Sequence, residues 1–422
     1  MGLRGARGIE SRFRRYVEGL VSVIGHADRA QPLRDYCTGL VMPVERKSVE
    51  PMAAITAPGR TGAQHQSLLH FVGQGDWSDA AVLAKVREVV LPRIERHGPI
   101  EAMIIDDTSF PKQGRHSVGV GHQYCGQLGK QANCQVAVTL SLANHAASLP
   151  VAYRLYLPKD WAEDQVRRHK VGVPDEIGFK TKPEIALEHI RWAHAIGLPG
   201  DLVVLDAGYG NDAKLRTGIT ELEKVYVAGI QAQTLVWPPG TPPGKAPKLG
   251  RHDAPGAISV KEVAMGLRAK AWRRITWREG TNEELSSRFA RVRVHVASKH
   301  QPDKPAPEWL LIEWPKGEDE PTKYWLSTLP PDISFSALVN AAKLRWRIER
   351  DYEELKQEVG LGHFEGRGWR GFHHHATLCI AAYGFLISER ETIPPSGSRS
   401  TALFAQPALP RGYRPRGSSL AA

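Results

Sequence analysis

The sequence contains little cysteine, and its cysteines are widely separated. There are four in 422 residues, and no two of them form a CxxC pair. A disulfide scaffold or a cysteine-type zinc site needs more cysteines at closer spacing, so neither organises this fold. Repeats of roughly 20 to 50 residues are also absent, which excludes solenoids and propellers.

Long hydrophobic runs are missing as well. No stretch reaches the roughly 18 consecutive apolar residues that a membrane-spanning helix needs. The N-terminal stretch MGLRGARGIESRFRRYVEGL has charges where a secretory signal has its apolar core. We therefore expect a cytoplasmic protein with no membrane partner.

Positive charge is in excess over the chain. Lys and Arg number 56 against 45 Asp and Glu, which gives a formal net charge of +11. This charge indicates a polyanionic partner, most plausibly nucleic acid, although a generally basic proteome would also produce it. The apolar fraction of 41% is enough to build a core, and the length predicts two or three domains.

The pattern of apolar residues divides the chain into five parts. Residues 1–98 are predicted to form a helical, Arg-rich N-terminal region, whose arginines would either bind DNA or be solvated on the helix surface. Short strands and covering helices at 99–230 indicate an α/β core. A β-rich insertion is expected at 231–325, and helices return at 326–391. The tail at 392–422 is rich in Pro, Ser and Arg and is expected to be disordered.

Single elements follow from periodicity and from capping residues. Helices are expected at 76–97, 183–197, 211–223, 334–361 and 372–390, the first opening on Asp76 or Ser78. Core strands are expected at 102–105, 134–144, 149–158, 202–206 and 225–230. Insertion strands are expected at 273–279, 289–298, 308–314 and 323–329.

Aspartates follow two of the short apolar strands. Asp106 and Asp107 come after the run at 102–105, and Asp206 comes at the end of LVVLD. Functional sites of open α/β sheets form at strand ends. Carboxylates brought together there repel each other unless a cation joins them, and Mg²⁺ takes oxygen ligands of this kind. Each aspartate taken alone is more typical of a turn or a helix cap, so a metal site is indicated only if a third acidic partner is present.

That partner lies on the helix predicted at 334–361. Arg345, Glu349 and Lys356 are separated by four and seven residues, so they project within roughly 40° of one another. An apolar stripe beside them would dock the helix on a sheet and comprises Leu344, Ile348, Leu355 and Val359. The alternative is a solvated face with an ordinary i,i+4 Arg–Glu pair, and the helix alone does not decide between the two.

Taken together, these motifs resemble a known family. RWRIE at 345–349, followed by Lys356, is similar to the Y-(2)-R-(3)-E-(6)-K signature of bacterial insertion-sequence transposases of the DDE superfamily, whose catalytic core is RNase H-like. IIDDTSFPKQGRHSVGV (104–120) resembles their first-aspartate segment, and VVLDAGYGND (203–212) resembles the second. Further similar stretches are YCGQLGKQANCQVAV (124–138), RKSVEPMA (46–53) and HFVGQGDW (70–77).

The resemblance assigns catalytic roles by position. Asp107 would be the first catalytic aspartate, because in the family that residue stands directly before a threonine, and Asp106 would be its neighbour. Asp206 would be the second aspartate and Glu349 the glutamate. These three would hold two Mg²⁺ ions, with Mn²⁺ as a substitute.

DNA-binding roles also follow from the resemblance. Arg345 and Lys356 would bind phosphates, whereas the signature tyrosine falls on Ala342. Trp325, with Tyr324 second, is the candidate to stack on a flipped base, as an aromatic residue before the last helix does in relatives. The partners would be the inverted-repeat ends of a transposon and target DNA, bound by a homodimer at the nucleoid.

Three activities remain open from the sequence. The first is a transposase that cuts transposon ends and joins them to target DNA. A catalytically inactive or domesticated transposase-derived protein that only binds DNA is the second. An RNase H-like nuclease specific for DNA structure is the third.

Two other motifs do not support a separate site. The Gly-rich run at 114–130 contains Gly129 and Lys130, but it lacks P-loop spacing and predicts a β-hairpin or bulge. His373, His374 and His375 point about 100° apart on a helix, so packing roles are expected rather than one shared metal.

Overall fold

A computed structural model of the chain describes residues 3–243, 256–279, 284–298 and 306–392. The predicted tail lies outside the described residues except for Thr392, as does part of the Pro- and Gly-rich stretch at 238–250. Among the described residues, no helix combines the length and the apolar character that a membrane span requires.

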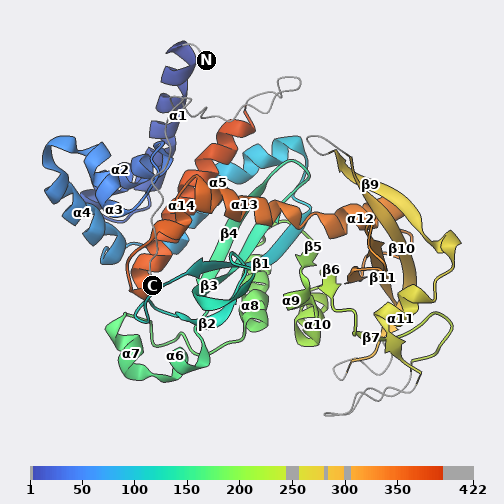
Figure 1. The fold of residues 1–422 in the computed structure, drawn as a ribbon. Helices are drawn as coiled ribbons and strands as arrows, with labels where there is room; N and C mark the ends of the chain where they lie inside the picture. The colour runs from blue at the N-terminus through green and yellow to red at the C-terminus, as the bar shows by residue number, and fades with distance from the viewer. Residues whose placement is uncertain (1–2, 244–255, 280–283, 299–305, 393–422) are drawn as a thin grey trace, which may run out of the picture.

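The N-terminal region is helical, as predicted, and it packs on the last long helix (Figure 1). Its helices are α1 (Leu3–Val21), α2 (Ala30–Val41), α3 (Val49–Thr56), α4 (Thr61–Gly73) and α5 (Asp79–Ile94), and the last helix is α14 (Trp369–Arg390). Ser78, one of the two predicted caps, accepts a hydrogen bond from the Ala81 amide at 3.2 Å and starts α5. A buried hydrogen bond from the Tyr16 hydroxyl to the Ala381 carbonyl ties α1 to α14.

One mixed sheet runs through both the core and the insertion. Its hydrogen-bonded order is β2-β3-β1-β5-β6-β12-β11-β10-β7-β8, with β4 beside β3 and β9 beside β10. The core strands are β1 (Ala102–Pro111), β2 (Gly121–Cys125), β3 (Lys130–Ala143), β4 (Ser148–Leu155), β5 (Leu202–Leu205) and β6 (Val225–Ile230). The insertion strands are β7 (Leu235–Trp237), β8 (Ile258–Ser259), β9 (Arg273–Glu279), β10 (Glu284–Val296), β11 (Glu308–Trp314) and β12 (Lys323–Ser327).

Strands β1, β5 and β6 are parallel, and β12 joins the insertion to the core by pairing antiparallel with β6. The insertion is therefore continuous with the catalytic sheet. This mixed α/β sheet with covering helices agrees with the predicted RNase H-like fold class.

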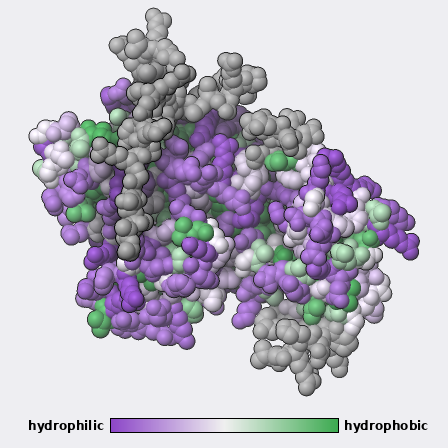
Figure 2. Space-filling model, viewed as in Figure 1, coloured by the Kyte–Doolittle hydropathy of each residue, from purple (hydrophilic) through white to green (hydrophobic). Residues whose placement is uncertain are grey.

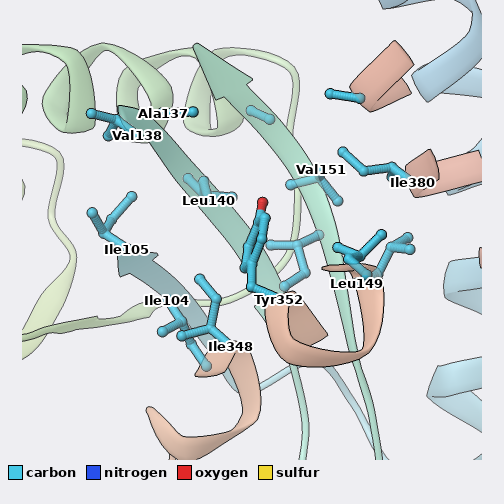
Figure 3. Close-up of a cluster of buried hydrophobic side chains, with 14 of the residues drawn as sticks. Ile104, Ile105, Ala137, Val138, Leu140, Leu149, Val151, Ile348, Tyr352 and Ile380 are labelled. Carbon is cyan, nitrogen blue, oxygen red and sulfur yellow. The ribbon is translucent and has the colours of Figure 1, made fainter. Parts of the chain in front are cut away.

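Helices cover both faces of the core sheet. Side chains of a strand alternate between faces, so neighbouring residues of β1 point to opposite sides. Figure 3 shows Ile104 beside Ile348 of helix α13 (Trp346–Gln357), while Ile105 projects away from that helix. The opposite face carries α8 (Lys182–Ala195) and α10 (Ala213–Glu221), and smaller elements are α6 (Lys159–Glu163), α7 (Gln165–Lys170), α9 (Ala207–Gly210) and α11 (Val260–Met265).

The prediction of a single helix at 334–361 is wrong, because the structure has two helices in this range. Helix α12 (Phe335–Lys343) ends before Leu344, and α13 begins at Trp346. At the break, the amides of Leu344 and Arg347 bond to carbonyls three residues back instead of four. The break lets α12 cover the insertion sheet while α13 lies on the core sheet, where the predicted apolar stripe is buried.

Strand β1 is longer than predicted. It continues through Asp106 and Asp107 to Pro111, because residues up to Pro111 stay paired with β3. Both aspartates therefore lie within a strand instead of after it. The Gly-rich run forms the predicted hairpin, in which β2 and β3 are joined by a turn with Gly129 at a φ of 64°.

Figure 2 shows a mostly hydrophilic surface on the viewed face, with hydrophobic side chains in small separate groups. The buried hydrophobic residues instead form one large cluster that runs from the N-terminal helices through the core sheet, and a smaller one between the insertion sheet and α12. A third, small cluster comprises Cys125, Cys134 and Val136.

Candidate active site

The two adjacent aspartates of β1 face different neighbours. Asp106 is two residues after Ile104, so its side chain points to the same face of the sheet, the one that α13 covers. The Asp106 carboxylate pairs there with the Arg345 guanidinium. Asp107 pairs instead with the Lys182 ammonium at 2.7 Å, at the start of α8. Asp106 therefore forms its ion pair next to the helix that carries Glu349, whereas Asp107 forms its ion pair at the start of α8.

Arg345 connects two of the acidic residues. One guanidinium nitrogen pairs with Asp106 and another with Glu349, one helical turn further along α13. Burial lowers the pKa of Arg345, but the charges of Asp106 and Glu349 outweigh that effect and hold it above its usual value. The Glu349 side chain is 56% exposed, so it remains accessible to a ligand.

Asp206 follows β5 and caps the short helix α9. Its Oδ1 accepts a hydrogen bond from the Tyr209 amide at 3.0 Å. A Cβ at Gly208 would lie 3.2 Å from Asp206 Oδ1 and 3.4 Å from Oδ2, so glycine keeps the space beside this carboxylate open. Because β1 and β5 are parallel neighbours, their ends bring Asp106 and Asp206 to one region of the sheet.

Electrostatics link the aspartates. Burial raises the pKa of the Asp106 carboxyl to about 7; Arg345 lowers it, whereas Asp206 and Asp107 raise it further. Arg345 offsets only part of the cost of a charged Asp106, so a further cation beside these carboxylates would stabilise the charged form. The donors here are carboxylate oxygens, which suit a hard divalent cation.

The carboxylates are not arranged as a closed cage. Among the described residues, no group of three or more His, Cys, Asp or Glu side chains is placed to hold a metal ion as it stands. Arg345 lies between Asp106 and Glu349 and supplies the positive charge there. A divalent ion therefore fits the chemistry of the donors, and binding it requires these side chains to shift.

Lys356, the last residue of the signature, is half-buried. Its ammonium donates to the Ser109 carbonyl oxygen at 2.9 Å and lies 5.3 Å from the ring centroid of Phe110. Burial lowers the pKa of this lysine. Lys356 thus holds β1 just beyond the aspartates, while its predicted contact with DNA phosphate stays a prediction.

The predicted stacking residue lies at the joint between the insertion and α12. Trp325 is half-buried on β12, and the Lys343 ammonium lies 5.5 Å from its ring centroid. Tyr324 is buried, with its hydroxyl bonded to the Pro321 carbonyl. Ala342 is buried against the insertion sheet, so the position of the signature tyrosine does not face the carboxylates.

Sequence reasoning missed two residues near the carboxylates. Lys182 was not singled out, because only the fold shows that the start of α8 meets β1. Tyr209 is 3% exposed, and its hydroxyl has no hydrogen-bond partner among the residues that the structure describes. Burial, followed by the charges of Asp107, Asp106 and Asp206, raises its pKa. The AGYG turn after Asp206 marked this position, but nothing in it revealed an unpaired hydroxyl.

Aspartates at the ends of parallel strands, beneath a helix that carries a further glutamate, are the arrangement expected of an RNase H-like nuclease. The sequence matches the DDE superfamily endonuclease family over residues 19–284, more than half of the chain, so the protein belongs to that family. It is also similar to a probable transposase for insertion sequence element IS701 from Microchaete diplosiphon. The two are 24% identical over 327 residues, which are 77% of this chain and 74% of the relative.

Proposed function

We propose that this protein is a DNA transposase that cuts the inverted-repeat ends of an insertion sequence and joins them to target DNA. The observation that carries the proposal is the pairing of Arg345 with both Asp106 and Glu349, next to the strand end that carries Asp206. Family membership and the similarity to a probable transposase support it. The chemistry is phosphoryl transfer, in which an activated water or 3′-hydroxyl attacks phosphorus in line with the leaving oxygen.

The metal-binding residues of the proposal are Asp206, Glu349 and one aspartate of β1. We favour Asp106 over Asp107 as that aspartate, because Asp106 shares Arg345 with Glu349 whereas Asp107 pairs with Lys182. Two Mg²⁺ ions, or Mn²⁺ in their place, would stabilise the charge on the attacking and leaving oxygens. DDE endonucleases generally use divalent metals, and the oxygen-only donor set fits them.

The cationic side chains near the carboxylates would also bind and position the DNA. Arg345 neutralises Asp106 and Glu349 in the protein without DNA, and it is close enough to the carboxylates to grip a scissile phosphate bound there. Lys356 connects α13 to β1 through its hydrogen bond to the Ser109 carbonyl oxygen. Trp325 would stack on a flipped base at the joint with the insertion, where aromatic stacking offsets part of the unstacking cost.

The remaining parts of the proposal concern assembly. The Arg-rich helical region at 1–98 would bind the transposon ends, and two copies of the chain would hold a pair of ends together. Nucleoid localisation would follow from this DNA binding. Deletion of residues 1–70 tests the first point through the loss of end-specific binding.

The deciding experiment uses the DNA that flanks the gene. Duplexes that carry those ends are incubated with the protein, Mg²⁺ and a supercoiled target plasmid, and cut and joined products are separated on gels. We expect both products, and neither with Asp206→Ala or Glu349→Ala. Binding without cutting would identify a transposase-derived DNA-binding protein, and cutting of branched DNA without joining would identify a structure-specific nuclease.

A further inference from the structure

Three arginines form a cluster on the insertion sheet beside the start of α12. Arg291 and Arg293 lie on the same face of β10 as Phe289, which is buried beneath α12. Arg273 lies on the neighbouring strand β9, directly opposite Phe289 in the register. Arg273 is exposed, and the other two are half-buried. We call Arg273, Arg291 and Arg293 the arginine cluster.

Aromatic rings form the floor of this cluster. The guanidinium carbons of Arg291 and Arg293 lie 4.5 Å and 4.9 Å from the ring centroid of Trp309. Arg291 and Arg273 also lie 5.1 Å and 6.0 Å from the Phe335 ring. Trp309 is held in place by its indole nitrogen, which donates to the Pro330 carbonyl at 3.1 Å. The guanidinium planes are thus supported by fixed rings and need little ordering when they bind a ligand.

Within the described part of the chain, the cluster makes no direct ion pair with a carboxylate, although the charge of the nearby Glu308 carboxylate raises the pKa of Arg293 against the effect of burial. Arg291 donates to the Ile333 carbonyl at 2.6 Å and Arg293 to the Pro307 carbonyl. Nη1 of Arg293 is buried and has no hydrogen-bond partner in the described ranges of the chain. Burial lowers the pKa of Arg291, and the charge of Arg273 lowers it further. Three like charges held together in this way are stabilised by an added anion.

The position of the cluster relates it to the carboxylates. Ile333, which accepts from Arg291, precedes α12, whereas Arg345 follows it. The nine residues of α12 rise about 1.5 Å each, or roughly 13 Å, and the residues that flank the helix add a few ångströms, so the two sites lie roughly 15 to 20 Å apart. The successive phosphates of one strand advance about 3.4 Å along the axis of the duplex, so this span corresponds to about five base pairs along that axis.

We propose that the arginine cluster binds the phosphate backbone of duplex DNA about five base pairs from the phosphate held at the carboxylates. This inference rests on the proposed function, because the carboxylates define the position of the cut. The arginines donate to phosphate oxygens, while Trp309 and Phe335 support the guanidinium planes. The surface reads no base edges, so it binds without sequence preference.

The test measures DNA affinity against salt concentration by fluorescence anisotropy. Two series of duplexes carry the element's end sequence. The first series varies the length of DNA on the flanking side of the cut, and the second varies the length on the transposon side. Each series has a short duplex that ends 2 base pairs from the cut and a long one that ends 12 base pairs from it. The variant replaces Arg273, Arg291 and Arg293 by Gln. The matched control replaces three exposed cations outside the insertion, Arg96, Lys130 and Arg191, by Gln.

In one of the two series, wild-type protein should show a salt slope steeper by about 2 to 3 for the longer duplex, since each phosphate contact contributes about 0.9. The Gln variant should lose that difference and bind the longer duplex at least tenfold more weakly, while the control keeps it. Substitution of all three arginines by Lys should restore most of the slope. Tryptophan fluorescence and thermal melting check that each variant is folded.

An equal slope for long and short duplexes in both series, or a Gln variant that keeps the wild-type difference, would overturn the proposal. Neither result touches the proposed function, which is judged by Mg²⁺-dependent cutting and joining. If wild-type protein binds the duplexes but never cuts them, the proposed function fails while the backbone-binding surface is still measured.

Discussion

The Arg345 guanidinium pairs with the Asp106 carboxylate across 239 residues of sequence, and this contact joins α13 to β1. The same guanidinium reaches Glu349. Arg345 thus sets the separation between an aspartate of the sheet and the glutamate of the helix before any cation or DNA arrives.

The two aspartates of β1 should differ in their effect on cleavage. We expect Asp106→Asn to lower Mg²⁺-dependent cleavage of end DNA by roughly 10³-fold or more, because it removes a carboxylate from the group shared with Glu349. Asp107→Asn should cost much less, since it breaks an ion pair with Lys182. Single-turnover cleavage measures both. If Asp107→Asn lowers the cleavage rate more than Asp106→Asn does, Asp107 is the first catalytic aspartate, as the family resemblance predicts.

Gly208 keeps open the space beside Asp206. An alanine there would place its Cβ 3.2 Å from Asp206 Oδ1, so the carboxylate must shift by a few tenths of an ångström. We expect Gly208→Ala to lower cleavage about tenfold and to leave the free energy of unfolding within about 1 kcal/mol. Gly210→Ala is the contrasting variant, because its Cβ would clash with the Gly229 carbonyl and destabilise the fold. Full cleavage by Gly208→Ala would show that Asp206 needs no such space.

His375 should make stability depend on pH. Burial lowers its pKa to about 4, with its Nδ1 2.8 Å from the Tyr36 hydroxyl and its Nε2 3.0 Å from the Gly360 carbonyl. Its ordinary pKa is near 6.5, so between pH 6.5 and 4 the unfolded chain binds more protons at this residue than the folded chain. The contribution of His375 to stability is present above pH 6.5 and is lost as the pH falls toward 4.

Urea unfolding of wild type and His375→Gln isolates this effect from other titrating groups, among them Asp106 and Asp351, whose pKa values of about 7 oppose it. The difference in free energy of unfolding between the two proteins should change by about 3 kcal/mol from pH 7 to pH 4, to the disadvantage of wild type. A constant difference would mean that His375 does not titrate differently on folding.

Lys343 and Glu313 form a buried ion pair where α12 meets the insertion. The Lys343 ammonium lies 2.6 Å from Glu313 Oε2, and the Glu313 side chain is 3% exposed. Lys343→Met leaves a buried carboxylate without its partner, so we expect a loss of about 3 kcal/mol in the free energy of unfolding. The double variant Lys343→Met, Glu313→Gln should recover most of it. If the double variant is as unstable as Lys343→Met, packing of the lysine stem against Trp277 and Trp325 would be the larger contribution.

Local chemistry explains which parts of the fold could be predicted. Strand β6 has the predicted bounds 225–230, because its apolar run is closed by polar residues on both sides. The consecutive histidines are packing residues, as predicted: His374 stacks on Trp77, and His375 bonds to Tyr36. The break at Leu344 and Arg345 could not be predicted, since both residues favour helix and only the competing attachments to insertion and core separate α12 from α13.

The choice between adjacent aspartates was also beyond the sequence. Alternation along β1 places Asp106 and Asp107 on opposite faces, but no local pattern states which face receives α13. That information resides in the docking of Ile348 beside Ile104, a contact between residues more than 200 positions apart.

The pairing of β12 with β6 has a consequence for engineering. Excision of the insertion would leave β6 as an open edge, with unpaired backbone groups along residues 227–230 that now pair with β12. Such an edge is a template for intermolecular strand addition, so a shortened enzyme would aggregate before its activity could be measured. A minimal catalytic version must keep β12, or must carry a charged or proline-bearing substitute along that edge.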